Sequence, residues 1–183
     1  MPVFTDGAGG EHAASVSKDL KGQVLAATDR GIAAASLRGD AFAWCSVSYD
    51  QTAADTILIV RNNDPDRLLV IDRAWMWTDV AGKWTLHCPA TGLTMDGTAV
   101  VGVNLNKASA RVAKATATTN ETTNAIVAIV ANVYTPDGSA LQGTTVELNG
   151  SVVLGYDQSF ALDCASAALD TLAWVWGYYI DAA

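Results

Sequence analysis

The sequence predicts an all-β protein, a sandwich or barrel built from short strands. From Phe42 onward, short runs rich in β-branched and aromatic residues alternate with turn residues, and no stretch has the period of a long amphipathic helix. Half of the residues are hydrophobic and 16% are charged, so the chain can bury a core. Its 183 residues leave room for one domain of roughly 140 to 150 residues and an appendage. We therefore expect an N-terminal arm over residues 1–41 and one β domain over residues 42–183.

The first 41 residues lack the regularity of the rest of the chain. Glycines and alanines are scattered through them, and the apolar residues are spaced too irregularly for a convincing amphipathic helix. This composition predicts an extended arm with one helical turn near residues 19–27. Such an arm can become ordered when it binds a neighbouring subunit.

Ten segments have the character of strands and are separated by turn residues. They span residues 43–49, 56–61, 68–78, 83–88, 99–104, 124–134, 144–148, 152–154, 159–162 and 172–180. Asn149-Gly150 is typical of a two-residue hairpin turn between the seventh and eighth of these segments. Residues 106–124 are small and polar and are long for a loop, which predicts an excursion that packs on a neighbour or stays mobile.

The last predicted strand alternates between two kinds of side chain. One face carries Leu172, Trp174, Trp176, Tyr178 and Ile180. The other carries the smaller Ala173, Val175 and Gly177, alongside Tyr179. The period of two predicts a strand with one strongly aromatic face. Aromatic side chains are large, rigid anchors, and six tryptophans are available for a core or an interface.

Charge and cysteine usage exclude several classes of protein. The net charge is −8, and residues 115–183 contain seven acids and no base, which argues against direct binding of DNA or RNA. The sequence has no secretory signal pattern, and its longest apolar stretch, residues 125–131, is too short to cross a bilayer. Cys45, Cys88 and Cys164 are widely spaced and odd in number, which predicts free, mostly buried thiols and synthesis in a reducing cytoplasm.

Few residues have the pattern of a metal site. His12 lies in the expected arm and His87 in an expected strand, where its neighbour Cys88 points to the opposite face, so a zinc site would need more convergent ligands. The oxygens of Asn62, Asn63, Asp64 and Asp66 could ligate calcium, but the same residues describe an Asp-Pro turn between two strands, which we favour. We expect no metal and no cofactor.

Catalysis is equally weakly indicated. There is no G-x-S-x-G element, and the cysteines have at most His87 as a partner from the domain. The acids Asp79, Asp96, Glu121 and Glu147 could form a glycosidase pair only if the fold brought them together, and solvated turn residues are the simpler interpretation. We expect the chain not to be an enzyme.

Trp75, Trp77 and Trp84 could instead form a platform on which a sugar stacks. Large aromatic side chains belong more often to a core or a subunit interface, which we favour for them. Arg30 and Arg38 could clamp acidic patches on a partner, and the alternative is a solvated arm.

An ordered set of residues resembles a family of head-decoration, or cement, proteins of tailed bacteriophages. Its elements are Gly39 and Phe42 before a strand rich in Leu and Ile, followed by Gly97, Thr98, Val100, Asn104, Asn106 and Ser109 in a G-T-x-V-x-x-x-N-x-N-R-x-S-like element. Lys107 stands where the family more often has Arg. The resemblance is good over residues 38–110, is in outline only over the C-terminal third, and hardly extends to the first 37 residues.

The resemblance implies a TNF-like jelly-roll, a β-sandwich of about 8 to 10 strands. It also implies a homotrimer that binds the major capsid protein on the outer surface of the virion. The residues expected at the capsid or subunit interface are Phe4, Leu20, Arg30, Arg38, Phe42, Trp75, Trp77, Trp174 and Trp176. The alternatives are a head- or tail-fibre module that binds a host receptor or a glycan and, as a third choice, a glycan hydrolase.

Overall fold

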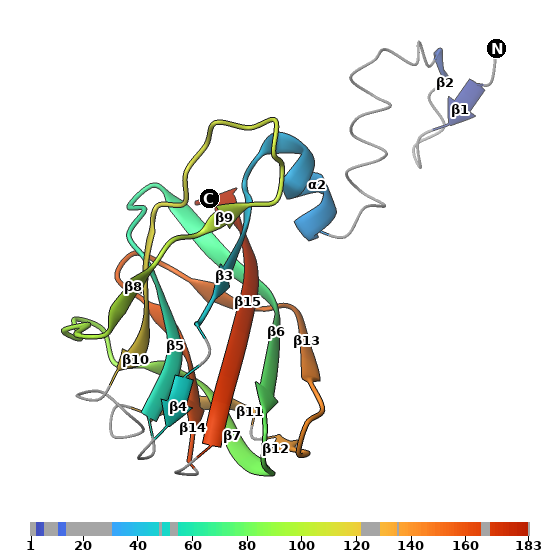
Figure 1. Ribbon diagram of the computed structural model, residues 1–183. Helices are drawn as coiled ribbons and strands as arrows, with labels where there is room; N and C mark the ends of the chain where they lie inside the picture. The colour runs from blue at the N-terminus through green and yellow to red at the C-terminus, as the bar shows by residue number, and fades with distance from the viewer. Residues whose placement is uncertain are drawn as a thin grey trace.

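The strand-forming runs assemble into two antiparallel sheets that pack face to face (Figure 1). The structure is a computed structural model and describes residues 3–5, 11–13, 31–47, 49–51, 55–121, 129–134, 136–165 and 169–182. A separate hairpin pairs β1 (Val3–Thr5) with β2 (Glu11–Ala13). The predicted helical turn at residues 19–27 lies outside the described residues.

The first layer, here called the β5–β14 sheet, has the strand order β11-β7-β14-β5-β10-β8, with β12 (Asp137–Gly138) paired to β7. Its strands are β5 (Asp55–Asn62), β7 (Gly82–Pro89), β8 (Thr98–Val100), β10 (Ala115–Glu121), β11 (Ile129–Tyr134) and β14 (Ser159–Cys164).

The second layer, here called the β6–β15 sheet, has the order β13-β6-β15-β3-β9, with β4 (Tyr49–Gln51) paired to the start of β15. Its strands are β3 (Ala41–Cys45), β6 (Arg67–Thr78), β9 (Val103–Asn104), β13 (Thr144–Leu154) and β15 (Leu169–Asp181).

Eight strands form the framework of the sandwich: β3, β5, β6, β7, β11, β13, β14 and β15. Numbered one to eight along the chain, they lie in the order 6-3-8-1 in one sheet and 5-4-7-2 in the other. The chain therefore crosses between the layers at every step except the one from β7 to β11. This strand order is that of a jelly-roll, so the predicted all-β jelly-roll sandwich is confirmed.

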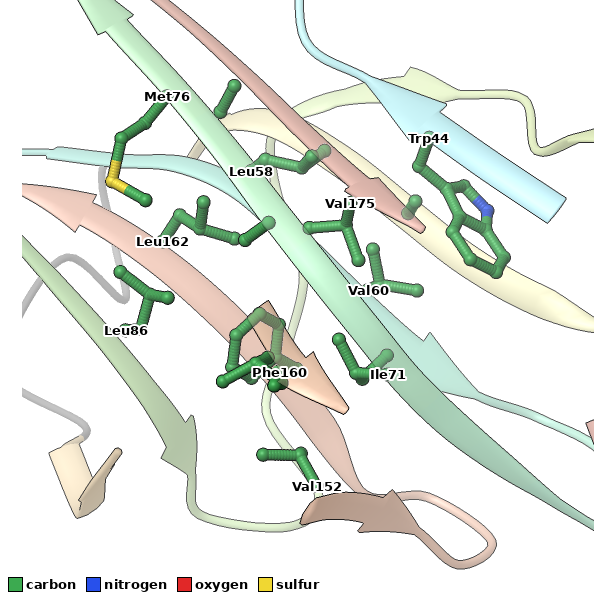
Figure 2. Packing of buried hydrophobic residues seen from close by; sticks show 14 of the residues in the cluster. Trp44, Leu58, Val60, Ile71, Met76, Leu86, Val152, Phe160, Leu162 and Val175 are labelled. Atoms are coloured by element: carbon green, nitrogen blue, oxygen red, sulfur yellow. The ribbon is translucent and has the colours of Figure 1, made fainter. Parts of the chain in front are cut away.

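The inward faces of the two sheets share one hydrophobic cluster (Figure 2). Trp44, Ile71 and Val175 contribute from the β6–β15 sheet, and Leu58 and Phe160 meet them from the β5–β14 sheet. Each of these side chains is at most 1% exposed. Burying one such side chain contributes about 1.5–3 kcal/mol, so the cluster is the main source of stability.

The predicted alternation along the last strand is confirmed. In β15 the side chains of Ala173, Val175 and Tyr179 are buried, whereas those of Trp174 and Trp176 on the other face are only half-buried. The small side chains and Tyr179 thus enter the core, and the tryptophans lie on the outer face of the sheet.

Residues 31–38, which were expected in an extended arm, form helix α2 (Gly31–Arg38) instead. The helix ends where Gly39, with a φ of 79°, donates its N–H to Ser36 O and Asp40 donates to Ala35 O, at 2.9 and 2.8 Å. This is the Schellman arrangement, in which glycine tolerates the left-handed backbone. Gly31 lies against the ring of Tyr178, so the helix packs on β15.

The predicted hairpin at Asn149-Gly150 is wrong. Both flanking segments pair with β6, from Thr144 opposite Met76 to Leu154 opposite Leu69, so β13 is a single strand. Its register shifts between Glu147 and Val152, where the extra residues bulge out. Asn149 and Gly150 have the positive φ values, 50° and 76°, that a hairpin turn would need, but here they shape a bulge.

Two further segments differ from their predictions. Residues 99–104 do not form one strand, because β8 pairs with β10 in one sheet and β9 pairs with β3 in the other. Gly102 lies at the switch against the indole of Trp44, where a larger residue would not fit. Residues 115–121, expected within a long polar loop, form β10, which inserts between β5 and β8.

Candidate interaction surface

The outer face of the β6–β15 sheet collects four predicted interface residues, Trp75, Trp77, Trp174 and Trp176. All four are half-buried, whereas their strand neighbours Ala74, Met76, Ala173 and Val175 are at most 1% exposed and face the core. Because successive residues of a strand point to opposite faces, the four tryptophans share one side of the sheet. With Arg73 and Leu172 they form what is here called the aromatic face.

The strand register brings these side chains side by side. Trp77 lies opposite Leu172, and Trp75 lies opposite Trp174. In the next row, Arg73 lies opposite Trp176. The rings of Trp174 and Trp176 are 5.5 Å apart between centroids and are tilted by 31°. Cross-strand neighbours this close make one continuous surface rather than separate exposed residues.

The face continues toward β3 and β9. Trp174 pairs with Cys45, Trp176 pairs with Ala43, and Ala43 in turn pairs with Val103, which is 48% exposed. Together with the half-buried indoles, these residues make an apolar surface that spans the sheet. Several partly exposed tryptophans gathered on one face of a sheet indicate a binding region.

Helix α2 turns one end of the aromatic face into a groove of about 420 Å³. The groove is lined by Ile32, Ala33, Ser36, Arg73, Trp75, Leu105, Thr145 and Trp176. Gly143 allows the Trp75 indole to lie close against the backbone, since a Cβ there would overlap the ring. The volume lies within the usual range of small-ligand sites.

Arg73 is the charged residue of the aromatic face. Its Nε lies 2.9 Å from Asp72 Oδ2, and its Nη1 lies 3.4 Å from Glu147 Oε1 on β13. The Arg73 and Glu147 side chains are 36% and 46% exposed, so water screens their pairing. The pair orients the guanidinium at the edge of the groove and adds little to folding stability.

The other predicted interface residues lie elsewhere. Phe42 is 1% exposed and packs in the core against Trp44 and Tyr179, so its expected place at an interface is wrong for the folded chain. Arg38 ends α2, with its Nε 3.8 Å from Asp40 Oδ2. Phe4 lies in β1 opposite His12, and its side chain is not described. Leu20 and Arg30 lie outside the described residues.

Sequence reasoning missed the groove residues contributed by α2 and by Leu105. The signal was present in part, because the Ala-rich run 31–38 is followed by glycine, a common helix ending. Thr145 and Leu105 gave no such signal, because they reach the groove only through strand pairing and the loop that follows β9.

Four motif residues of the resemblance, Gly39, Asn104, Asn106 and Ser109, meet at one corner of the sandwich, whereas Thr98 and Val100 belong to β8 in the other sheet. The Asn104 amide donates to Gly39 O and to Arg111 O, both at 2.9 Å, and its Oδ1 accepts from Asn106 N at 2.8 Å. The Asn106 amide donates to Leu37 O at 3.2 Å. These bonds fasten the loop between β9 and β10 to the end of α2.

A charged hollow of about 980 Å³ lies beside this corner. Arg67 Nη1 is 2.9 Å from Asp40 Oδ1, and its Nε is 2.7 Å from Asp64 Oδ2. Arg111 contacts the same oxygen of Asp40, and Lys114 Nζ lies 3.9 Å from Asp64 Oδ2. Four cations, counting Arg38, therefore converge on two carboxylates.

Two of the residues considered for calcium, Asn62 and Asp64, have their oxygens engaged in other bonds, in line with the favoured Asp-Pro turn. Asn62 Oδ1 accepts from Asp64 N at 2.9 Å, and Asp64 Oδ1 accepts from Asp66 N at 3.1 Å. Burial raises the pKa of the Asp64 carboxyl, but the hydrogen bond from Arg67 and the neighbouring cations outweigh it and hold the pKa below its usual value. The carboxylate thus serves as the acceptor of an Asp-Pro turn and of an ion pair.

Among the residues that the structure describes, no group of three or more His, Cys, Asp or Glu could hold a metal ion. His87 Nε2 lies 2.6 Å from Asp163 Oδ2, with both side chains 1% exposed. Cys164 is buried, and burial raises the pKa of both the Cys45 and Cys88 thiols, which makes the reactive thiolate scarcer.

Three of the four acids considered for hydrolysis, Asp79, Glu121 and Glu147, have carboxylates engaged by other residues of the fold. Glu121 accepts hydrogen bonds from Asp96 N and Gly97 N, both at 2.9 Å, and from the Thr118 hydroxyl. Burial raises the Glu121 pKa, but these hydrogen bonds lower it further than burial raises it. Asp79 accepts from Asp170 N at 2.9 Å, and Glu147 pairs with Arg73.

The sugar platform of Trp75, Trp77 and Trp84, considered above as the less favoured alternative, is not assembled. Trp75 and Trp77 are on the outer face of β6, but Trp84 is fully buried in the core. A sugar that stacked on this face would therefore contact Trp75 and Trp176, which both line the groove.

Comparison with protein-family models, with curated proteins and with solved structures finds no match. Over the part of the chain that the structure covers, no helix has both the length and the apolar character needed to cross a membrane.

Proposed function

We propose that this chain is a structural protein of a bacteriophage virion, a decoration or cement protein that forms a homotrimer and binds the major capsid protein on the outer capsid surface. The observation that carries the proposal is the aromatic face, which gathers four tryptophans on the outer side of a jelly-roll sheet. The chain acts by binding and not by catalysis.

The chemistry of the aromatic face supports self-association. Interfaces are enriched in Trp and Arg and depleted in Lys and Glu, and the face combines Trp75, Trp77, Trp174 and Trp176 with Arg73. Burying the tryptophans against equivalent surfaces of two further copies removes apolar area from water at little cost in conformational entropy. A closed ring of three copies covers the face on every subunit.

The resemblance supplies the virion context. Among the residues that carry it, Gly39, Asn104 and Asn106 fasten one corner of the sandwich. This part of the motif supports a loop that keeps its shape on a particle.

The groove favours a second candidate, a fibre module that binds a host receptor or a glycan. Trp75 and Trp176 line it together with Arg73 and Thr145, and aromatic rings beside polar groups can stack and orient a sugar. In this alternative the groove stays open to solvent and the chain is present in few copies.

The copy number of the chain in purified virus particles tests the proposal. Quantitative mass spectrometry against the major capsid protein measures it. Hundreds of copies per particle are expected for a decoration protein, and a few to a few dozen copies would favour the fibre module. Absence from particles would refute both virion functions.

A further inference from the structure

The loop between β9 and β10 and the end of α2 form one rigid projection at an end of the sandwich (Figure 1). Asn104 and Asn106 bind the loop to Gly39 O, Arg111 O and Leu37 O. Gly39 is in contact with Ser109, and a Cβ at Gly39 would overlap the serine side chain. The end of α2 and the loop therefore fix each other's conformation.

This projection carries aliphatic side chains that are largely exposed among the residues that the structure describes. Leu37 and Val112 are each 77% exposed, one on α2 and one on the loop. Single exposed aliphatic residues are ordinary on protein surfaces. Two exposed aliphatic residues on one projection indicate a binding surface only when the charged side chains on the same projection are considered with them.

The loop and the end of α2 also carry exposed cations. Residues 97–120 contain Lys107, Arg111 and Lys114 and no acid, in a chain of net charge −8. The side chains of Arg38, Arg111 and Lys114 are 53%, 58% and 56% exposed. Their carboxylate partners are largely hidden, since the Asp40 and Asp64 side chains are 10% and 0% exposed.

The remaining acidic residues that line the charged hollow belong neither to α2 nor to the β9–β10 loop. Asp66 lies in the β5–β6 turn and Asp181 at the end of β15, and both are exposed. The loop and α2 therefore present the positive side of the hollow. Leu37, Arg38, Lys107, Arg111, Val112 and Lys114 together are here called the loop tip.

We propose that the loop tip is the surface that docks on the capsid shell, and that it fits a protein surface with carboxylates around an apolar centre. The proposal rests on the proposed function and adds which surface meets the shell and the chemistry of the partner. Leu37 and Val112 supply apolar contact, and the exposed cations pair with acids around it. Complementary charge of this kind raises the association rate and fixes orientation.

The aromatic face and the loop tip then have different partners. The tryptophans bind copies of the same chain, and the loop tip binds the shell. Attraction between the tip and an acidic shell is screened by salt, whereas the largely apolar contacts of the aromatic face are much less so.

Binding to capsid shells assembled without this chain tests the assignment. The tip variant combines Lys107→Glu with Val112→Ser, both at exposed side chains. The matched control combines Lys83→Glu with Val80→Ser, which makes the same chemical changes at exposed residues beside the β6–β7 turn. Thermal melting and native mass confirm that both variants keep the fold and oligomeric state of the parent chain.

The tip variant is expected to bind shells at least about 10-fold more weakly than the parent chain, with a smaller dependence on salt. The control is expected to bind within about 2-fold of the parent. Equal binding of the tip variant and the parent overturns the docking assignment and leaves the proposed function in place. A parent chain that does not bind shells overturns the proposed function and the assignment with it.

Discussion

Two buried carboxylates, those of Asp64 and Glu121, act as acceptors that hold loop backbone in place. Asp64 and Glu121 are both 0% exposed, and each accepts backbone N–H groups as well as a side-chain hydrogen bond. A buried carboxylate without such partners would cost several kcal/mol, so its environment has to supply donors. Both residues thus fix chain reversals of the sandwich rather than forming a reactive pair.

The first prediction concerns acid stability. The pKa values of Asp64 and Glu121 are lower in the folded chain than their usual values, so the folded state is favoured above the usual carboxyl range near pH 4. This stabilisation is lost as the pH falls through the lowered pKa values. Asp64→Asn is expected to lower stability at pH 7 by about 1–3 kcal/mol and to flatten its decline in acid.

Urea unfolding at a series of pH values between neutral and acid measures the effect. Asp66→Asn, at an exposed residue of the same turn, is the control and is expected to change the unfolding free energy by less than about 0.5 kcal/mol. An Asp64→Asn variant that follows the parent's pH curve in parallel would contradict the structural role of the carboxylate.

The second prediction concerns the point at which the chain changes sheets. A Cβ at Gly102 would lie 2.6 Å from Trp44 Nε1 and 2.8 Å from Ala113 Cβ. Trp44 is fully buried, so the clash cannot be relieved by moving it into solvent. Gly102→Ala is expected to destabilise the fold by about 1–3 kcal/mol in urea unfolding.

Gly155→Ala provides the matched control for Gly102→Ala. A Cβ at Gly155 would have Gln158 Oε1 as its nearest neighbour, at 3.4 Å, and that oxygen belongs to a flexible side chain at the surface. Equal stability of the two variants would show that Gly102 is not a packing constraint.

At the scale of elements, the sequence allowed most strands to be predicted but not their partners. The alternation in residues 172–180 predicted both faces of β15 correctly, because one face carries indoles and the other mostly small residues. The Asn149-Gly150 pair had the right backbone preference and still gave a wrong hairpin. Its positive φ values suit a bulge as well as a turn, and pairing with β6 decides between them.

The candidate site was also predictable only in part, because it depends on which strands pair and in which register. Trp75 and Trp77 share a face with each other, but the sequence of β6 is apolar on both faces, so it does not indicate which face is buried. Phe42 and Trp84 prove to be core residues because of the sheets that their strands join. Only the register places Trp75 opposite Trp174.

The third prediction concerns the aromatic face. Trp75→Ser with Trp176→Ser removes two indoles from the outer side of the sheet and leaves the core residues between them in place. If these indoles are central interface residues, self-association is expected to weaken by roughly 100-fold or more, with the fold retained. Sedimentation over a concentration series measures the change.

Tyr156→Ser is the control for the aromatic face, because Tyr156 is 64% exposed and lies on the β13–β14 connection. It is expected to leave self-association unchanged. Equal self-association of the double tryptophan variant and the parent chain would exclude the aromatic face as the subunit interface.

At the scale of the whole molecule, charge and apolar surface are unevenly distributed. The chain carries a net charge of −8, yet residues 97–120, which include the loop that meets α2, have three bases and no acid. The aromatic face lies on the outer side of the β6–β15 sheet. One scaffold thereby has two surfaces of different chemistry, and the proposed function assigns the first to the loop tip that meets the shell and the second to copies of the same chain.

The most direct test of this account is the native mass of the purified chain in solution. The account predicts a species of three chains, each of 19.1 kDa, that persists at micromolar concentration and at high salt because its contacts are mainly apolar. A chain that remains monomeric under these conditions would contradict the central claim that the aromatic face is a subunit interface.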